Sequence, residues 1–63
     1  MKYKIKELRE QKGMSQEKLS KKANVSRAIL SGLETGGRTE TTTKTLSKIA
    51  DALDEEICNI FLL

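Results

Sequence analysis

The 63-residue sequence contains no histidine and only one cysteine, Cys58. A lone cysteine without a histidine has no base to activate its thiol, which argues against nucleophilic catalysis. No glycine-rich phosphate loop and no cluster of metal-ligating residues is found either. We therefore expect no enzymatic activity, no cofactor and no metal. Because one cysteine cannot form an internal disulfide, the sequence indicates a reducing compartment. Cys58 lies at helical spacing among apolar neighbours and is expected to fill the core or its edge.

Long apolar runs are also absent. No segment approaches the roughly 20 apolar residues of a membrane span, and the first residues, MKYKIKELRE, lack the apolar centre of a signal peptide. We therefore expect a cytoplasmic protein without membrane contact. A chain of this length buries only a modest core, so we expect one small domain over residues 1–63. Its net charge of +3 is too mild to indicate nucleic-acid binding by itself.

The segment from Ser15 to Gly36, SQEKLSKKANVSRAILSGLETG, carries the strongest signal. Ser15 and Ser26 are each suited to cap the start of a helix, because a serine hydroxyl accepts from backbone donors that a helix start leaves free. Asn24 lies between the two helices and tolerates a left-handed backbone. Gly36 is placed to end the second helix. The segment thus predicts two short helices joined by a tight turn.

The apolar residues of this segment share one face of each predicted helix. Leu19 and Ala23 are four positions apart in the first helix, and Leu30 and Leu33 are three apart in the second. Ser20 is small, as is required where two crossing helices approach closely. This combination is typical of a helix-turn-helix.

Helices are also predicted before and after this segment. Ile5 and Leu8 are three positions apart in a polar stretch that ends at Gly13. A second amphipathic helix follows the i, i+3, i+4, i+7 pattern, and Thr42 or Thr43 is suited to cap it; its apolar residues are Leu46, Ile49, Ala50 and Leu53.

A last short helix is expected after Asp54, which is suited to cap its start; the helix would hold Ile57, Ile60 and Phe61. No segment alternates with a period of two for long enough to indicate a strand. The fold class is therefore all-α.

Three stretches in this order and spacing, IKELREQKGMSQEKLS, NVSRAILSGLETG and TLSKIADAL, resemble the Cro and phage-repressor family of DNA-binding domains, also called the XRE-like family. The resemblance extends from Ile5 to about Phe61. It implies a lambda-repressor-like domain of five helices with the helix-turn-helix at its centre. The partner it implies is double-stranded DNA, and the function is that of a transcriptional regulator, most simply a repressor.

The chain departs from the family pattern in a few places. Ser20 and Asn24 replace residues that are commonly alanine and glycine, and both changes are sterically mild. Gly32 replaces a side chain that is often long and polar, which weakens the case for a base contact there. The loop before the fourth helix has a run of threonines, residues 41–43, where relatives usually have proline.

The resemblance also implies which residues meet DNA. The helix at about residues 26–35 is expected to enter the major groove, where Arg27 reaches a guanine edge or an adjacent phosphate; the alternative is a solvated surface arginine. The candidate base contacts are Arg27, Ala28, Ser31 and Gly32. Helix starts favour an anion, and the candidate phosphate contacts are Ser15, Gln16, Ser26, Arg38, Thr42, Thr43 and Lys44. In the family, matching residues to Arg9 and Glu34 form a partly buried structural ion pair.

One recognition helix reads only a few base pairs, which favours a two-fold dimer. We expect the homodimer interface at the apolar C-terminal end, at Ile57, Ile60, Phe61, Leu62 and Leu63. In the alternative, this tail folds back and completes the core of a monomer. A second functional hypothesis is an antitoxin or anti-repressor that acts mainly by binding a protein partner.

Overall fold

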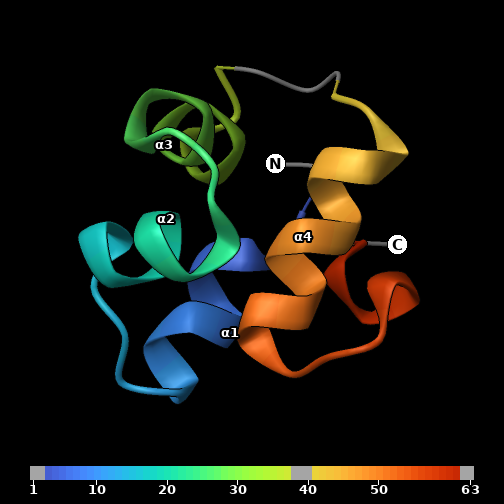
Figure 1. The fold of residues 1–63 in the computed structure, drawn as a ribbon, viewed down its shortest axis with the longest axis horizontal. Helices are drawn as coiled ribbons and strands as arrows, with labels where there is room; N and C mark the ends of the chain where they lie inside the picture. The colour runs from blue at the N-terminus through green and yellow to red at the C-terminus, as the bar shows by residue number, and fades with distance from the viewer. Residues whose placement is uncertain (1–2, 38–40, 62–63) are drawn as a thin grey trace.

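The computed structural model describes residues 3–37 and 41–61, which form four α-helices and a final 3-10 helix. The elements are α1 (Ile5–Gln11), α2 (Gln16–Ala23), α3 (Arg27–Thr35), α4 (Thr43–Leu53) and η1 (Ile57–Ile60). Helix α4 packs against α2 on one side and against η1 on the other, and α3 packs on α2 (Figure 1). The all-α class is confirmed. The expected fifth helix is a single 3-10 turn rather than an α-helix.

Three helices begin with a side-chain cap, as the sequence predicts. The hydroxyl oxygens of Ser15, Ser26 and Thr42 each accept a hydrogen bond from the backbone N–H three residues later, at 3.0, 3.2 and 3.2 Å. Thr42 rather than Thr43 caps α4, and Thr43 is the first residue of that helix. Each cap satisfies one backbone donor that the helix start leaves free.

Three helices end in a left-handed residue. Asn24 ends α2 with φ of 58°, and Gly36 ends α3 with φ of 87°, both at the predicted positions. Asp54 ends α4 with φ of 57°, so the prediction that it caps the start of the last helix is wrong. A short polar side chain suits both a helix start and a left-handed helix end, so the residue type did not distinguish them. Glu56 precedes η1, without a side-chain cap.

The core lies between the four helices and η1. Its fully buried side chains are Ile5, Leu19, Leu30, Leu33, Ile49, Leu53 and Ile60. Ser20 of α2 is buried, and its hydroxyl donates to the Glu17 carbonyl at 2.9 Å. Cys58 is exposed, so the expectation that it fills the core is wrong. In a 3-10 helix the residues three apart share a face; Ile57 and Ile60 pack inward, which leaves Cys58 outside.

The two ends of the described chain meet beside α4 (Figure 1). Tyr3 and Phe61 form an isolated antiparallel bridge, and the Lys4 N–H donates to the Ile60 carbonyl at 2.6 Å. Phe61 therefore lies after η1 and not within it. Ile60 is fully buried and offers no surface to a second copy, which corrects its assignment to the dimer interface. Leu62 and Leu63 lie outside the described residues.

None of the helices within residues 3–37 and 41–61 has the length and apolar character needed to cross a membrane.

Candidate nucleic-acid interface

Helix α3 has one fully buried face and one open face. Leu30 and Leu33 are fully buried, which fixes the helix against the core. Arg27 and Ala28, in its first turn, are exposed. Among the residues that the structure describes, the Arg27 guanidinium has no hydrogen-bond or ion-pair partner, so it is available to an external ligand.

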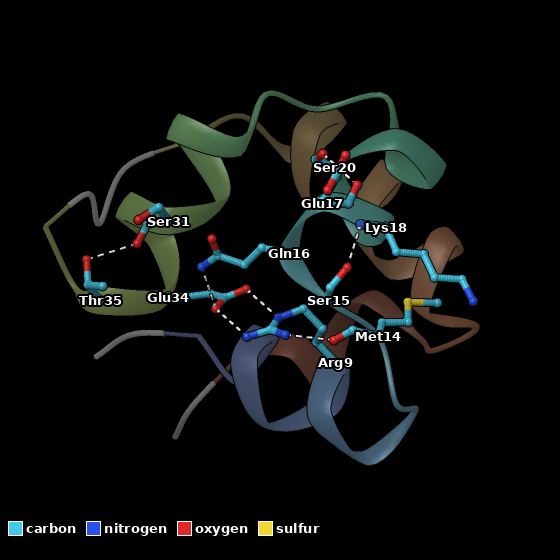
Figure 2. A network of polar contacts seen from close by, with 10 residues as sticks. All are labelled: Arg9, Met14, Ser15, Gln16, Glu17, Lys18, Ser20, Ser31, Glu34 and Thr35. Carbon is cyan, nitrogen blue, oxygen red and sulfur yellow. Dashed lines mark hydrogen bonds and ion pairs between the residues drawn. The ribbon is translucent and has the colours of Figure 1, made fainter.

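The rest of the open face of α3 is small. Ser31 and Gly32 are half-buried and lie one turn after Arg27 and Ala28. The Thr35 hydroxyl donates back to the Ser31 carbonyl at 2.9 Å (Figure 2). A helix face with short side chains lets the backbone approach a groove floor closely, and an exposed arginine at its start supplies paired N–H donors.

One polar network connects the last turn of α3 with α1 and with the start of α2 (Figure 2). The guanidinium of Arg9 donates from Nε to Glu34 Oε2 at 3.0 Å and from Nη2 to Oε1 at 3.1 Å. Its Nη1 donates to the Met14 carbonyl at 2.7 Å. The side chain of Glu34 is only 2% exposed and that of Arg9 11%. The hydrogen bond to Glu34 raises the pKa of Arg9, while burial opposes the rise.

Gln16, the first residue of α2, joins this network. Its Nε2 donates to Glu34 Oε1 at 3.1 Å, so the side chain extends from the start of α2 toward α3 (Figure 2). Sequence reasoning treated Gln16 separately from the pair of Arg9 and Glu34, because no local spacing signals a contact across 18 positions. The structure brings all three together.

The start of α4 presents hydroxyls and a positive charge. Thr42, Thr43 and Lys44 are exposed. The Thr42 hydroxyl is within 3.0 Å of the Thr45 hydroxyl, in addition to capping the helix. Arg38 lies outside the described residues. The first turn of α4 lies on the same side of the molecule as α3 (Figure 1).

The opposite end of α4 is acidic. An open groove of about 530 Å³ lies between this end and η1, and four carboxylates line it: Asp51, Asp54, Glu55 and Glu56. Lys12 pairs with Glu55 at 3.2 Å. Carboxylates repel phosphate, so this end of α4 is unsuited to nucleic acid. The start of α4 therefore carries a positive side chain and its end carries negative ones.

Comparison with known proteins agrees with this geometry. A family model described as helix-turn-helix matches residues 5–58. The chain belongs to this family. The predicted resemblance to the XRE-like group is therefore confirmed, and the function is sequence-specific DNA binding in transcription regulation. The family consists of DNA-binding regulators and not of enzymes. This favours DNA binding over the alternative of an antitoxin or anti-repressor that acts mainly on a protein.

Solved helix-turn-helix structures share the fold. The restriction-modification controller protein C.AhdI from Aeromonas hydrophila is 36% identical with a TM-score of 0.86, over 92% of this chain and 86% of that one. The N-terminal DNA-binding domain of SinR from Bacillus subtilis is 33% identical with a TM-score of 0.83, over 87% and 80%. A point mutant of the controller protein C.Esp1396I is 40% identical with a TM-score of 0.76, over 82% and 66%. No curated protein sequence matches the chain.

Proposed function

We propose that this helix-turn-helix chain is a repressor that binds its operator by placing α3 in the major groove. The observation that supports this most directly is the open face of α3, with an exposed Arg27 followed by small residues. Arg27 donates to a guanine edge or to the adjacent phosphate. Ala28 contacts a thymine methyl, while Ser31 and Gly32 let the helix approach the bases.

The phosphate contacts flank α3 in this proposal. Free backbone N–H groups and the positive end of the helix dipole favour an anion at the starts of α2 and α4. The residues assigned to phosphate are Ser15, Gln16, Ser26, Thr42, Thr43 and Lys44, together with Arg38. Because these contacts do not read the bases, they set affinity and register and not sequence preference. The protein acts on DNA in the cytoplasm.

Selection of bound sites from random duplexes tests the proposal. The wild type is expected to yield one recurring motif, and Arg27→Ala is expected to lose preference at one base pair of it, at a cost of about 1–3 kcal/mol. Lys48→Ala is the matched control, because it also removes one positive charge from an exposed helical position, on α4. Equal motifs from wild type and Arg27→Ala would show that Arg27 contacts a phosphate and does not read a base. The absence of any recurring motif among the duplexes selected by the wild type would contradict the role of α3.

The operator-bound state is a homodimer in this proposal. A two-fold dimer places two α3 helices about 34 Å apart, one turn of DNA. The half-buried Ile57 and Phe61 give the C-terminal end an apolar surface, to which Leu62 and Leu63 are also assigned. A two-fold contact is self-complementary, so the same surface meets itself.

Sedimentation with a palindromic site tests the dimer. Ile57→Glu places a charge in this surface and leaves the residues of the bridge between Tyr3 and Phe61 unchanged. Because Ile57 also packs against the core, the folded fraction of the variant is measured by circular dichroism. The wild type is expected to load two copies on each duplex and the variant one. Equal stoichiometry for wild type and variant would contradict this interface.

A further inference from the structure

The carboxylate of Glu34 lies where three segments of the chain meet. It belongs to α3, and it accepts hydrogen bonds from Arg9 of α1 and from Gln16 at the start of α2 (Figure 2). Because Glu34 is only 2% exposed, these bonds form away from water, and bonds to a charged acceptor are stronger than neutral ones. The side chain of Gln16 is therefore held before DNA arrives.

The orientation of a glutamine amide decides what it can bind. The nitrogen has two N–H donors and the oxygen only accepts, so a phosphate oxygen can be bound only by the nitrogen. An ionised carboxylate also accepts only, so Glu34 selects the orientation in which Nε2 faces it. One N–H is then used by Glu34 and the second is left for another acceptor. Arg9 neutralises Glu34, which removes its repulsion of a nearby phosphate.

We propose that Glu34 is a positioning residue for DNA binding: it fixes the amide of Gln16 with its nitrogen ready for a phosphate. This rests on the proposed function, in which Gln16 contacts the DNA backbone. Ordering a side chain before binding removes that entropic cost from the binding step. The bond also ties the phosphate contact of α2 to the last turn of α3.

For Glu34→Gln, the positioning role and the change in net charge predict opposite changes in affinity for DNA. Glu34→Gln removes one negative charge, so simple electrostatic attraction to DNA predicts tighter binding. Loss of positioning predicts weaker binding, because a neutral amide at position 34 no longer selects one orientation of Gln16. The direction of the change therefore separates the two effects.

A double-mutant cycle with a mixed-sequence duplex at fixed low salt tests the coupling. Wild type, Gln16→Ala, Glu34→Gln and the double variant are compared by fluorescence anisotropy, with affinity corrected for the folded fraction measured by circular dichroism. Gln16→Ala is expected to weaken wild-type binding about fivefold, and Glu34→Gln to weaken it severalfold. In the Glu34→Gln background, Gln16→Ala is expected to change affinity by less than about twofold.

Two results would overturn the positioning role: an equal loss for Gln16→Ala in both backgrounds, or tighter binding by Glu34→Gln. A wild-type chain that fails to bind the duplex at all would instead overturn the proposed function. These failures are distinguishable because the first two require a wild type that binds.

Because Glu34→Gln deprives Arg9 of an ionised partner and can unfold the chain, a measurement on the wild type keeps the proposal testable. The chain has two glutamines, Gln16 and the exposed Gln11 of α1, so the side-chain amide spectrum contains its own control. In the free protein, the Gln16 amide protons are expected to exchange with water more slowly than those of Gln11. On addition of the duplex, only the Gln16 signals are expected to shift. Exchange of Gln16 as fast as Gln11, or no shift of the Gln16 signals with a duplex that the anisotropy titration shows to be bound, overturns the proposal.

Discussion

Tyr3 and Phe61 join the two ends of the described chain: their backbones form an antiparallel bridge, and their ring centroids are 5.7 Å apart with an interplanar angle of 50°. Tilted aromatic pairs at this distance add stability beyond the area they bury. The C-terminal segment is therefore part of the folded core, and the apolar surface left for a second copy is smaller than the sequence suggests.

Phe61→Ala is accordingly expected to lower the free energy of unfolding by roughly 2 kcal/mol, from lost burial and the lost ring pair. In a domain of this size the melting temperature falls by roughly 4–8 °C per kcal/mol. Cys58→Ala, at an exposed neighbouring position, is the control and is expected to melt like the wild type. Thermal melts followed by circular dichroism test this prediction. Equal melting temperatures for Phe61→Ala and Cys58→Ala would contradict the role of the bridge.

Leu33→Ala is expected to be more damaging. Leu33 is fully buried in α3, and truncating a buried leucine removes contacts and leaves a cavity, which costs about 2–5 kcal/mol. So small a domain has little stability to lose, so we expect an unfolded or barely folded chain at room temperature. Urea titration measures the effect, with Lys22→Ala on the exposed face of α2 as the control. An unchanged denaturation midpoint for Leu33→Ala would show that the core is assigned wrongly.

Removing one partner of the ion pair between Arg9 and Glu34 is expected to destabilise the fold more than replacing both partners by apolar residues. Arg9→Met leaves the nearly buried Glu34 carboxylate without its charged partner, which costs about 3–5 kcal/mol. Arg9→Met combined with Glu34→Leu removes both charges, and we expect it to be more stable than Arg9→Met alone. Denaturation of the wild type and both variants gives the comparison. A double variant less stable than the single one would contradict this explanation.

Glu55 stabilises the fold in a way that depends on pH. Its hydrogen bond with Lys12, and next the one with Asn59, lowers the pKa of Glu55 below its ordinary value of 4.5. Because the pKa of Glu55 is lower in the folded state than in the unfolded state, its carboxylate stabilises the fold at a pH above the unfolded-state pKa. This stabilisation is lost as the pH falls through the folded-state pKa. The melting difference between wild type and Glu55→Gln is thus expected to be largest near neutral pH and to shrink below about pH 4.5. Glu56→Gln is the control, and a difference that grows in acid would contradict the assignment.

Local chemistry explains why much of the fold was predictable. The caps at Ser15 and Ser26 and the left-handed turn at Asn24 depend on neighbouring backbone atoms, so residue type and spacing were sufficient. The α4 core face was predictable from the i, i+3, i+4, i+7 spacing of its apolar residues. Asp54 was not, because the same side chain suits either end of a helix.

Contacts between distant positions were beyond local patterns. The bond from Gln16 to Glu34 and the bridge from Tyr3 to Phe61 depend on how whole helices pack. The exposure of Cys58 follows from the way η1 packs on α4: Ile57 and Ile60 face the core, and Cys58 lies between them in sequence on the outer side. For the interface, the family resemblance indicated which residues to consider, and the DNA contacts themselves stay predictions.

The salt dependence of DNA binding tests the central claim most directly. Each phosphate that a positive side chain neutralises releases counterions, so the logarithm of affinity falls linearly with the logarithm of salt concentration. Anisotropy titrations of the wild type at several salt concentrations are expected to show this steep fall. Lys44→Ala is expected to reduce the slope by about one for each bound copy, whereas Lys48→Ala is expected to leave it unchanged. Affinity that does not change with salt, or equal slopes for wild type and Lys44→Ala, would contradict the proposed DNA-binding surface.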